Sequence, residues 1–185
     1  MKFIIFSFVL ICSFAANCQT PEEQRFLDTL KMGGTYLIDK EMPEFKIKTV
    51  DGKEYSNKDL KNKITFINFW FEACAPCIAE MGALEALFLK FNPYKKFQFL
   101  SITYETKESI DNISLKYNMP YSIISTSPDS CYYLNFRKGF PTTIILNEEG
   151  RVAYFTIGGD TNPEGANLFF KTNIYPLLTC LLKCE

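Results

Sequence analysis

Two cysteines separated by two residues, Cys74 and Cys77, are the side chains of this sequence best suited to chemistry. A dense apolar run, residues 64–71, precedes them, and a helix-forming stretch, residues 78–91, follows. A cysteine at the start of a helix lies near free backbone N–H groups and the positive end of the helix dipole, which stabilise a thiolate. The short spacer allows the second sulfur to reach the first. The pattern predicts a dithiol that closes a Cys74–Cys77 disulfide and exchanges two electrons with the disulfide of another protein.

The two cysteines are expected to have different roles. Cys74, at the helix N-terminus, should be the more exposed sulfur, should have a lowered pKa, and should act as the nucleophile. A helical rotation of about 100° per residue places Cys77 within an apolar stripe, so Cys77 should be buried and should resolve a mixed disulfide from within. The stripe consists of Met81, Leu84, Leu87, Phe88 and Phe91.

Glu80 falls in the middle of the same stripe, between Leu87 and Phe91 on the helical projection. Burial penalises the charged form of a carboxyl group, so the pKa of Glu80 should be raised. We therefore expect Glu80 to relay protons to and from Cys77. The alternative is a first-turn glutamate that only complements the helix dipole at a solvated edge.

Composition excludes several other kinds of function. The chain of 185 residues contains no histidine, which rules out Ser-His-Asp triads, Cys-His proteases and histidine-ligated zinc. A CxxC pair also occurs in zinc and haem sites, but there is no second CxxC, and position 78 is Ile where a haem motif needs His. We expect no metal and no cofactor beyond the cysteine pair. The net charge of −1 predicts no nucleic-acid partner, and the length indicates one domain, expected to be a monomer.

The N-terminus is typical of an exported protein. Met1-Lys2 precede an apolar stretch of residues 3–16, too short for a transmembrane helix of about 20 residues. We predict a signal peptide in residues 1–18, with cleavage after Ala15, or alternatively a lipobox that ends at a lipidated Cys18. An uncleaved membrane anchor and a buried N-terminal element are the remaining alternatives. Residues 19–37 read as a linker with a short helix, and export would place the chain in an oxidising compartment such as the periplasm or cell envelope.

Hydrophobic periodicity predicts an α/β domain over residues 38–183 with a mixed central sheet flanked by helices on both faces. Turn and cap signals separate the elements: an Asp-Gly turn at residues 51–52 and a possible helix cap at Ser56. Strands are predicted at residues 42–49, 64–71, 97–104 and 121–125, followed by a hairpin of 142–146 and 151–157. Helices are predicted at 56–60, 78–91, 106–117 and 167–183.

Four motifs within these elements resemble the thioredoxin superfamily and, within it, the TlpA/ResA-like thiol–disulfide oxidoreductases of the cell envelope. Residues 43–45 with 51–53 resemble the N-terminal hairpin that these proteins share with peroxiredoxins, and residues 68–77 resemble the active-site strand and redox turn. Glu80 matches the acidic residue of the subfamily, and residues 139–143 resemble the cis-proline loop. The resemblance implies a thioredoxin-like fold with an added N-terminal β-hairpin and a subfamily insert within residues 101–126.

The resemblance also implies a substrate-binding surface around the dithiol. The Phe140–Pro141 bond should be cis, which would present the backbone of Phe140 to an extended substrate segment and block metal capture. Ala75, Pro76 and Trp70 are expected to contribute to the same surface, and Trp70 to pack the active-site end of the sheet. The chain departs from the subfamily pattern at Ala73, which replaces an aromatic residue, at Gly82, which replaces a proline, and at Asn68, where thioredoxin carries a buried aspartate.

The function expected from these features is reduction of disulfides in exported proteins, with apocytochrome c as one client class and electrons from a membrane thiol carrier, both implied by the resemblance. An oxidase or isomerase of secreted proteins is the nearest alternative. A peroxiredoxin would need Thr or Ser where Phe71 stands, and a non-enzymatic module would use the cysteines as a staple. Cys131 reads as a small buried apolar residue, and Cys180 and Cys184 as a geometrically awkward pair near the chain end.

Overall fold

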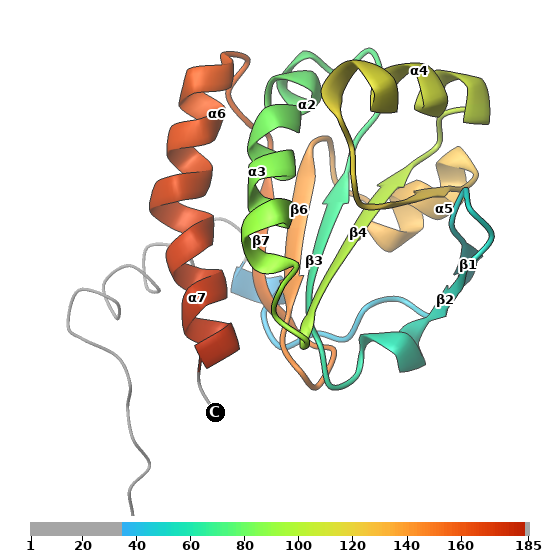
Figure 1. Cartoon of the computed structure of the whole chain (residues 1–185). Helices are drawn as coiled ribbons and strands as arrows, with labels where there is room; N and C mark the ends of the chain where they lie inside the picture. Colours follow the sequence, from blue (N-terminus) through green and yellow to red (C-terminus); the bar gives the residue numbers. More distant parts are fainter. Residues whose placement is uncertain (1–34, 184–185) are drawn as a thin grey trace, which may run out of the picture.

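The computed structural model describes residues 35–183, which form one five-stranded sheet covered by helices, with a small separate hairpin (Figure 1). The predicted signal peptide and lipidation site, and residues 19–34 of the predicted linker, lie outside the described residues. The last three residues of the predicted linker, Thr35–Leu37, form η2, and Leu37 is buried in the core. The elements are η2 Thr35–Leu37, β1 Lys46–Lys48, β2 Glu54–Ser56, η3 Asn57–Leu60, β3 Ile64–Phe69, α2 Ala75–Ala79, α3 Met81–Phe91, β4 Phe97–Thr103, α4 Lys107–Tyr117, β5 Ser122–Ser125, α5 Pro128–Leu134, β6 Thr142–Leu146, β7 Val152–Ile157, α6 Pro163–Phe169, the π-helical η4 Phe170–Ile174, and α7 Tyr175–Lys183.

The sheet has the strand order β5-β4-β3-β6-β7. β3, β4 and β5 run parallel, whereas β6 and β7 are antiparallel to their neighbours. Every residue of the central strand β3 is buried, as its nearly continuous apolar sequence predicts for a strand covered on both faces. The mixed sheet with a terminal hairpin is the predicted thioredoxin-like architecture, which is confirmed, as is the added β1–β2 hairpin.

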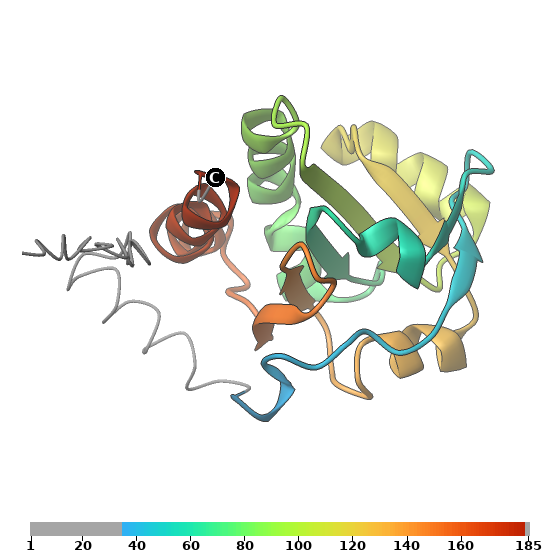
Figure 2. The same ribbon diagram turned by 90° about the horizontal axis from the view of Figure 1, so that it is seen from below.

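Alternation along β3 divides the core into two halves. Phe66 points to the face covered by α3, α4, α6 and α7, whereas Ile67 and Phe69 point to the face covered by α5, η3 and the N-terminal segment (Figure 2). Asn68 has the parity of Phe66, so its side chain lies under the helix that follows the cysteines. The sheet thus positions one polar residue beneath the redox motif.

The segment before β3 closes both edges of the sheet. The N–H groups of Asp39 and Val152 donate to the carbonyls of Val152 and Lys40, beside β7. At the other edge the Val50 N–H donates to the Ile123 carbonyl at 2.8 Å, which ties the β1–β2 hairpin to β5. Unpaired strand edges invite association with other chains, so these contacts protect the sheet.

Three helical features differ from the sequence-based predictions. The predicted helix 78–91 is two helices, because Glu80, with ψ of −5°, departs from helical geometry between α2 and α3. Helix α5 was not predicted, although Ser127 caps it by accepting the Ser130 N–H. The last helix begins at Pro163 rather than at residue 167, because Asn162 accepts the Glu164 N–H as its cap.

No helix within residues 35–183 is long and apolar enough to cross a membrane.

Candidate active site

The Cys74–Cys77 disulfide lies where the chain leaves the carboxyl end of β3 and enters α2. The two cysteines are bonded to each other, with their Cα atoms 5.2 Å apart. The Trp70 N–H donates to the Ile102 carbonyl at 3.1 Å and the Cys74 N–H to the Phe71 carbonyl at 3.2 Å, so β4 and a tight turn fix the approach to the first cysteine. Pro76 lies in the first turn of α2, where a missing N–H costs no helical hydrogen bond.

Cys74 is the N-cap residue of α2, and the Cys77 N–H points at its sulfur over 3.3 Å. When the disulfide is reduced, that N–H and the helix N-terminus favour the thiolate form of Cys74. Cys77 is completely buried, as predicted, and Cys74 is only 5% exposed. The expected order of exposure is therefore correct, but neither residue is freely accessible.

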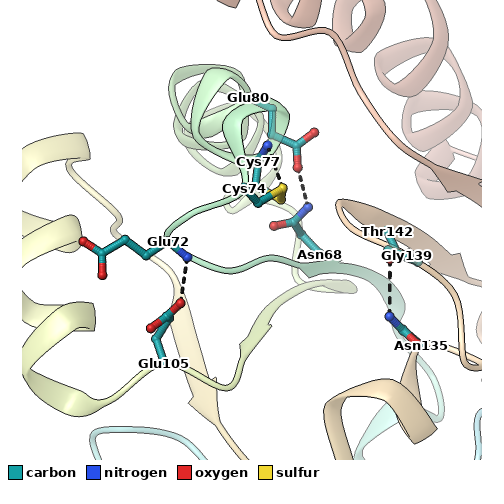
Figure 3. The surroundings of a disulfide bond; sticks show 9 residues. All are labelled: Asn68, Glu72, Cys74, Cys77, Glu80, Glu105, Asn135, Gly139 and Thr142. Atoms are coloured by element: carbon teal, nitrogen blue, oxygen red, sulfur yellow. Dashed lines mark hydrogen bonds between the residues drawn. A yellow bond between two sulfur atoms is a disulfide. The ribbon is translucent and has the colours of Figure 1, made fainter. Parts of the chain in front are cut away.

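Glu80 is buried under α2, where its Oε1 accepts a 2.7 Å hydrogen bond from the Asn68 side-chain amide (Figure 3). Burial raises the pKa of Glu80 from 4.5 to about 8, although the Asn68 hydrogen bond acts in the opposite direction. The predicted burial and raised pKa are confirmed, and the solvated-edge alternative is wrong. At neutral pH the carboxyl group is largely protonated, and a small rise in pH would release its proton beside the cysteine pair.

The loop that contains Pro141 forms the far wall of the site. The Phe140–Pro141 bond is cis, as predicted, and the Pro141 carbonyl accepts the Gly158 N–H at 2.8 Å. A β-carbon built on Gly159 would lie 3.4 Å from Pro141 Cγ, 3.5 Å from Glu80 Oε2 and 3.8 Å from Cβ of Pro76. The chain after β7 therefore passes close to the buried carboxyl group and to the first turn of α2.

The residues predicted to bind substrate differ in accessibility. Ala75 is exposed and Pro76 and Phe140 are half-buried, so a substrate can reach part of each of them. Trp70 is fully buried and donates its indole N–H to Ser101 Oγ at 2.7 Å. The structure does not place Trp70 where a substrate could touch it, because β4 and the core enclose its ring; it packs the active-site end of the sheet.

Sequence analysis missed an aromatic group beside the disulfide. The rings of Phe71, Tyr104 and Phe140 contact one another with centroid distances of 5.3–5.8 Å, and Tyr132 packs edge-on against Phe140 at 5.3 Å. These residues come from four separate segments, so no spacing in the sequence connects them. The only available signal was the position of Phe71 and Phe140 within the two recognised motifs.

The other cysteines that the structure describes belong to α5 and α7 rather than to the redox motif. Cys131 is completely buried in α5, and burial raises the pKa of its thiol to about 12, which agrees with the prediction of a small apolar residue. Cys180 is half-buried on α7, and Cys184 lies outside the described residues. No cluster of three or more potential metal ligands occurs within residues 35–183.

Comparison with known proteins places this arrangement in a family. The chain is 28% identical over 140 residues to the thiol-disulfide oxidoreductase ResA of Bacillus cereus, an alignment that covers 75% of this chain and 78% of ResA. Among solved structures, a Chlorobium tepidum protein assigned as the thiol:disulfide interchange protein DsbE superposes with a TM-score of 0.66 at 16% identity, over 78% of this chain and 97% of that protein.

A secreted disulfide oxidoreductase of Mycobacterium tuberculosis superposes with a TM-score of 0.57 at 16% identity, over 68% of this chain and 91% of that protein. At these identities the two superpositions establish the fold alone. The sequence profile of the AhpC/TSA family matches residues 38–155, which include the cysteine pair, Glu80 and the Pro141 loop. The chain therefore belongs to the AhpC/TSA family, and with its Cys74–Cys77 disulfide it is a thiol–disulfide oxidoreductase similar to ResA.

Proposed function

We propose that this protein reduces disulfides of exported proteins, with Cys74 as the nucleophile and Cys77 as the resolving thiol. The Cys74 thiolate attacks one sulfur of the client disulfide, and the other client sulfur leaves as a thiolate. Cys77, as a thiolate, then attacks Cys74 Sγ, which reforms the Cys74–Cys77 disulfide and releases the second client thiolate. A membrane thiol carrier returns two electrons. The observation that supports this assignment is the position of Cys74 at the N-cap of α2, with the Cys77 N–H directed at its sulfur.

Glu80 supplies the proton transfers in this proposal. Cys77 must lose a proton before it attacks the mixed disulfide and must regain one when the disulfide is opened again. A buried carboxyl group with a pKa of about 8, three residues after Cys77, can accept and return that proton near neutral pH. Glu80→Gln should lengthen the lifetime of the mixed disulfide, measured by acid quenching and mass spectrometry, while the fold is retained. Equal lifetimes in the two proteins would exclude the relay.

Insulin reduction by dithiothreitol tests the activity itself. The purified chain should accelerate the reaction, Cys74→Ser should abolish the acceleration, and Cys131→Ala, which removes a buried thiol outside the redox motif, should preserve it.

The direction of electron flow follows from equilibrium with glutathione: a potential well below about −200 mV indicates a reductant, and one near −120 mV indicates an oxidant or isomerase. A Cys77→Ser variant, which halts at the mixed disulfide, should capture exported proteins, and the presence or absence of apocytochrome c among them decides that client class.

Export and anchoring belong to the same proposal. Residues 1–18 would act as a signal peptide that is cleaved after Ala15, or would end at a lipidated Cys18 that holds the protein on the membrane. The intact mass of the native protein separates these outcomes, because a diacylglyceryl group adds mass to a chain that begins at Cys18. A full-length mass together with a cytoplasmic fraction would exclude export.

The family match gives peroxide reduction as a second candidate, because the AhpC/TSA profile covers the redox site. A peroxidatic cysteine requires a nearby hydroxyl to orient the peroxide, and the corresponding position carries Phe71, whose ring lies against Phe140. Peroxide-dependent oxidation of the reduced chain no faster than that of free cysteine would remove this candidate.

A further inference from the structure

A partly exposed aromatic surface lies next to the redox disulfide and has no role in the proposed chemistry. It consists of Phe71, Tyr104, Tyr132 and Phe140, and is called the aromatic surface below. Phe71 stacks on Tyr104 at 5.6 Å, while Phe140 stands edge-on to Phe71, Tyr104 and Tyr132 at 5.3, 5.8 and 5.3 Å. Three of the rings are half-buried, and Tyr132 is 43% exposed.

The backbone connects this surface directly to the reacting sulfur. The Phe71 carbonyl accepts the Cys74 N–H at 3.2 Å, and Phe140 immediately precedes Pro141. The other two rings come from the end of β4 and from α5, which lies across the opposite face of the sheet from α3 (Figure 2). A polypeptide whose disulfide lies at Cys74 would therefore pass its neighbouring residues over the aromatic surface.

Two glutamates lie on the segments that carry Phe71 and Tyr104. Glu105 Oε1 accepts the Glu72 N–H at 2.8 Å, and Glu72 Oε2 accepts the Ser109 hydroxyl at 2.7 Å, so both side chains are held beside the loop that leads to Cys74 (Figure 3). Within residues 35–183 neither carboxylate forms an ion pair. The neighbouring cation Lys107 is bound to Asp111 at 2.6 Å instead. Glu72 lines a surface pocket together with Lys116, whereas Glu105 follows Tyr104 directly and gives the aromatic surface an acidic rim.

We infer that the aromatic surface and its acidic rim form the client-docking site of this enzyme, for a segment that carries an aromatic or large aliphatic residue next to Lys or Arg, within a few residues of its disulfide. This inference rests on the proposed reductase function and adds the chemistry of the client. The apolar side chain of the client packs on Tyr132 and Phe140, and the cation lies beside Glu105. Charge complementarity selects this occupant over an acidic or purely polar segment.

Four short peptides test the inference. Each contains one cysteine capped as a disulfide with 2-hydroxyethanethiol, and they differ only at two adjacent positions, which hold Phe or Ser and Lys or Glu. The Cys74 thiolate attacks the peptide sulfur, 2-hydroxyethanethiolate leaves, and Cys77 then releases the peptide thiolate. We expect the Phe-Lys peptide to react fastest, with exchange of Lys for Glu slowing the reaction about two- to fivefold at low salt, and less at high salt.

Variants of the rim and of one ring identify the groups responsible. Glu72→Gln with Glu105→Gln keeps the hydrogen-bond acceptors but should bring the Lys-to-Glu rate ratio close to one, and Glu105→Lys should invert it. Tyr132→Ser should lower the Phe-to-Ser rate ratio about threefold to tenfold, and Tyr132→Phe should retain it. The matched control Glu149→Gln, on the exposed turn between β6 and β7, should leave both ratios unchanged.

The outcomes separate this inference from the proposed function. Equal rates for all four peptides, or rim variants that keep the preference for Lys, would overturn the docking site while reductase activity stands. A wild-type dimer that dissociates on Tyr132→Ser would assign the aromatic surface to a second copy of the chain and also overturn the inference. Failure to reduce even bis(2-hydroxyethyl) disulfide would refute the proposed function, and the docking site with it.

Discussion

Replacing Glu80 with Gln should make the oxidised protein more stable, by an amount that grows with pH. The folded state holds the Glu80 proton with a pKa of about 8, whereas the unfolded chain holds it with a pKa of about 4.5. Between these values the folded state binds more protons than the unfolded chain, so the free energy of unfolding falls as pH rises. The contribution of Glu80 is therefore fully favourable below pH 4.5 and is lost by pH 8.

The interval between pH 4.5 and about 8, at about 1.4 kcal/mol for each unit, gives about 5 kcal/mol. Glu80→Gln removes this dependence, since an amide has no proton to lose. With a urea m-value of about 2 kcal/mol/M, the unfolding midpoint of the variant should move upward relative to wild type by about 2 M between pH 5 and pH 8. Trp70, the single and fully buried tryptophan, reports unfolding by fluorescence.

Two further variants control this measurement. Glu149→Gln, an exposed glutamate far from the site, should follow the wild-type pH dependence. Asn68→Ala removes the hydrogen bond that lowers the pKa of Glu80, so the loss of stability should extend to higher pH than in wild type. Parallel pH dependence in the wild type and Glu80→Gln would refute the reasoning, because it would mean that Glu80 titrates equally in the folded and unfolded chain.

Four other substitutions test the framework of the site by denaturant unfolding. Ser101→Ala leaves the buried indole N–H of Trp70 without its acceptor, so it should lower the free energy of unfolding by about 1–3 kcal/mol and shift the maximum of the Trp70 fluorescence emission. An unchanged unfolding midpoint would contradict the hydrogen bond. Gly158→Ala, at φ of +78°, should cost about 1–2 kcal/mol, whereas Gly159→Ala meets ordinary contacts and should change stability by less than about 0.5 kcal/mol. Thr106→Ala removes the cap of α4 and should cost about 1 kcal/mol.

The parts of the fold that the sequence predicts well are those with a strong local signal. The apolar run of β3 has no polar face and therefore fits only a central strand. The predicted start of the helix at residue 106 is close to the observed one, because the Thr106 hydroxyl accepts the Ser109 N–H and caps α4. The burial of Glu80 was predicted from its position among apolar neighbours one and two turns away in a continuous helix. The prediction holds although the helix is interrupted, because Glu80 is the N-cap of α3 and its carbonyl accepts the Leu84 N–H.

The features that were missed depend on tertiary contacts or on weak local signals. Helix α5 is only seven residues long, and its start signal, Ser127 followed by Pro128, resembles that of an ordinary turn. The aromatic surface joins Phe71 with Tyr132 and Phe140 across long stretches of sequence, so only the completed sheet reveals it. The burial of Trp70 likewise depends on Ser101 from the adjacent strand, which makes the tryptophan a support of the site rather than its lining.

The π-helical stretch η4 determines which side of the C-terminal helix faces the sheet. Buried residues recur at exact four-residue steps there: Ala166, Phe170, Ile174, Leu178 and Leu182. In an uninterrupted α-helix four residues turn about 400°, which is about 40° more than a full turn. The excess adds up over successive steps, so the last of these side chains would rotate out of the interface. The widened turn, closed by the Tyr175 N–H on the Phe170 carbonyl, absorbs this excess. Deletion of one residue within it would restore regular α geometry, swing the second half of the helix by about 100°, and bring leucines to the solvent.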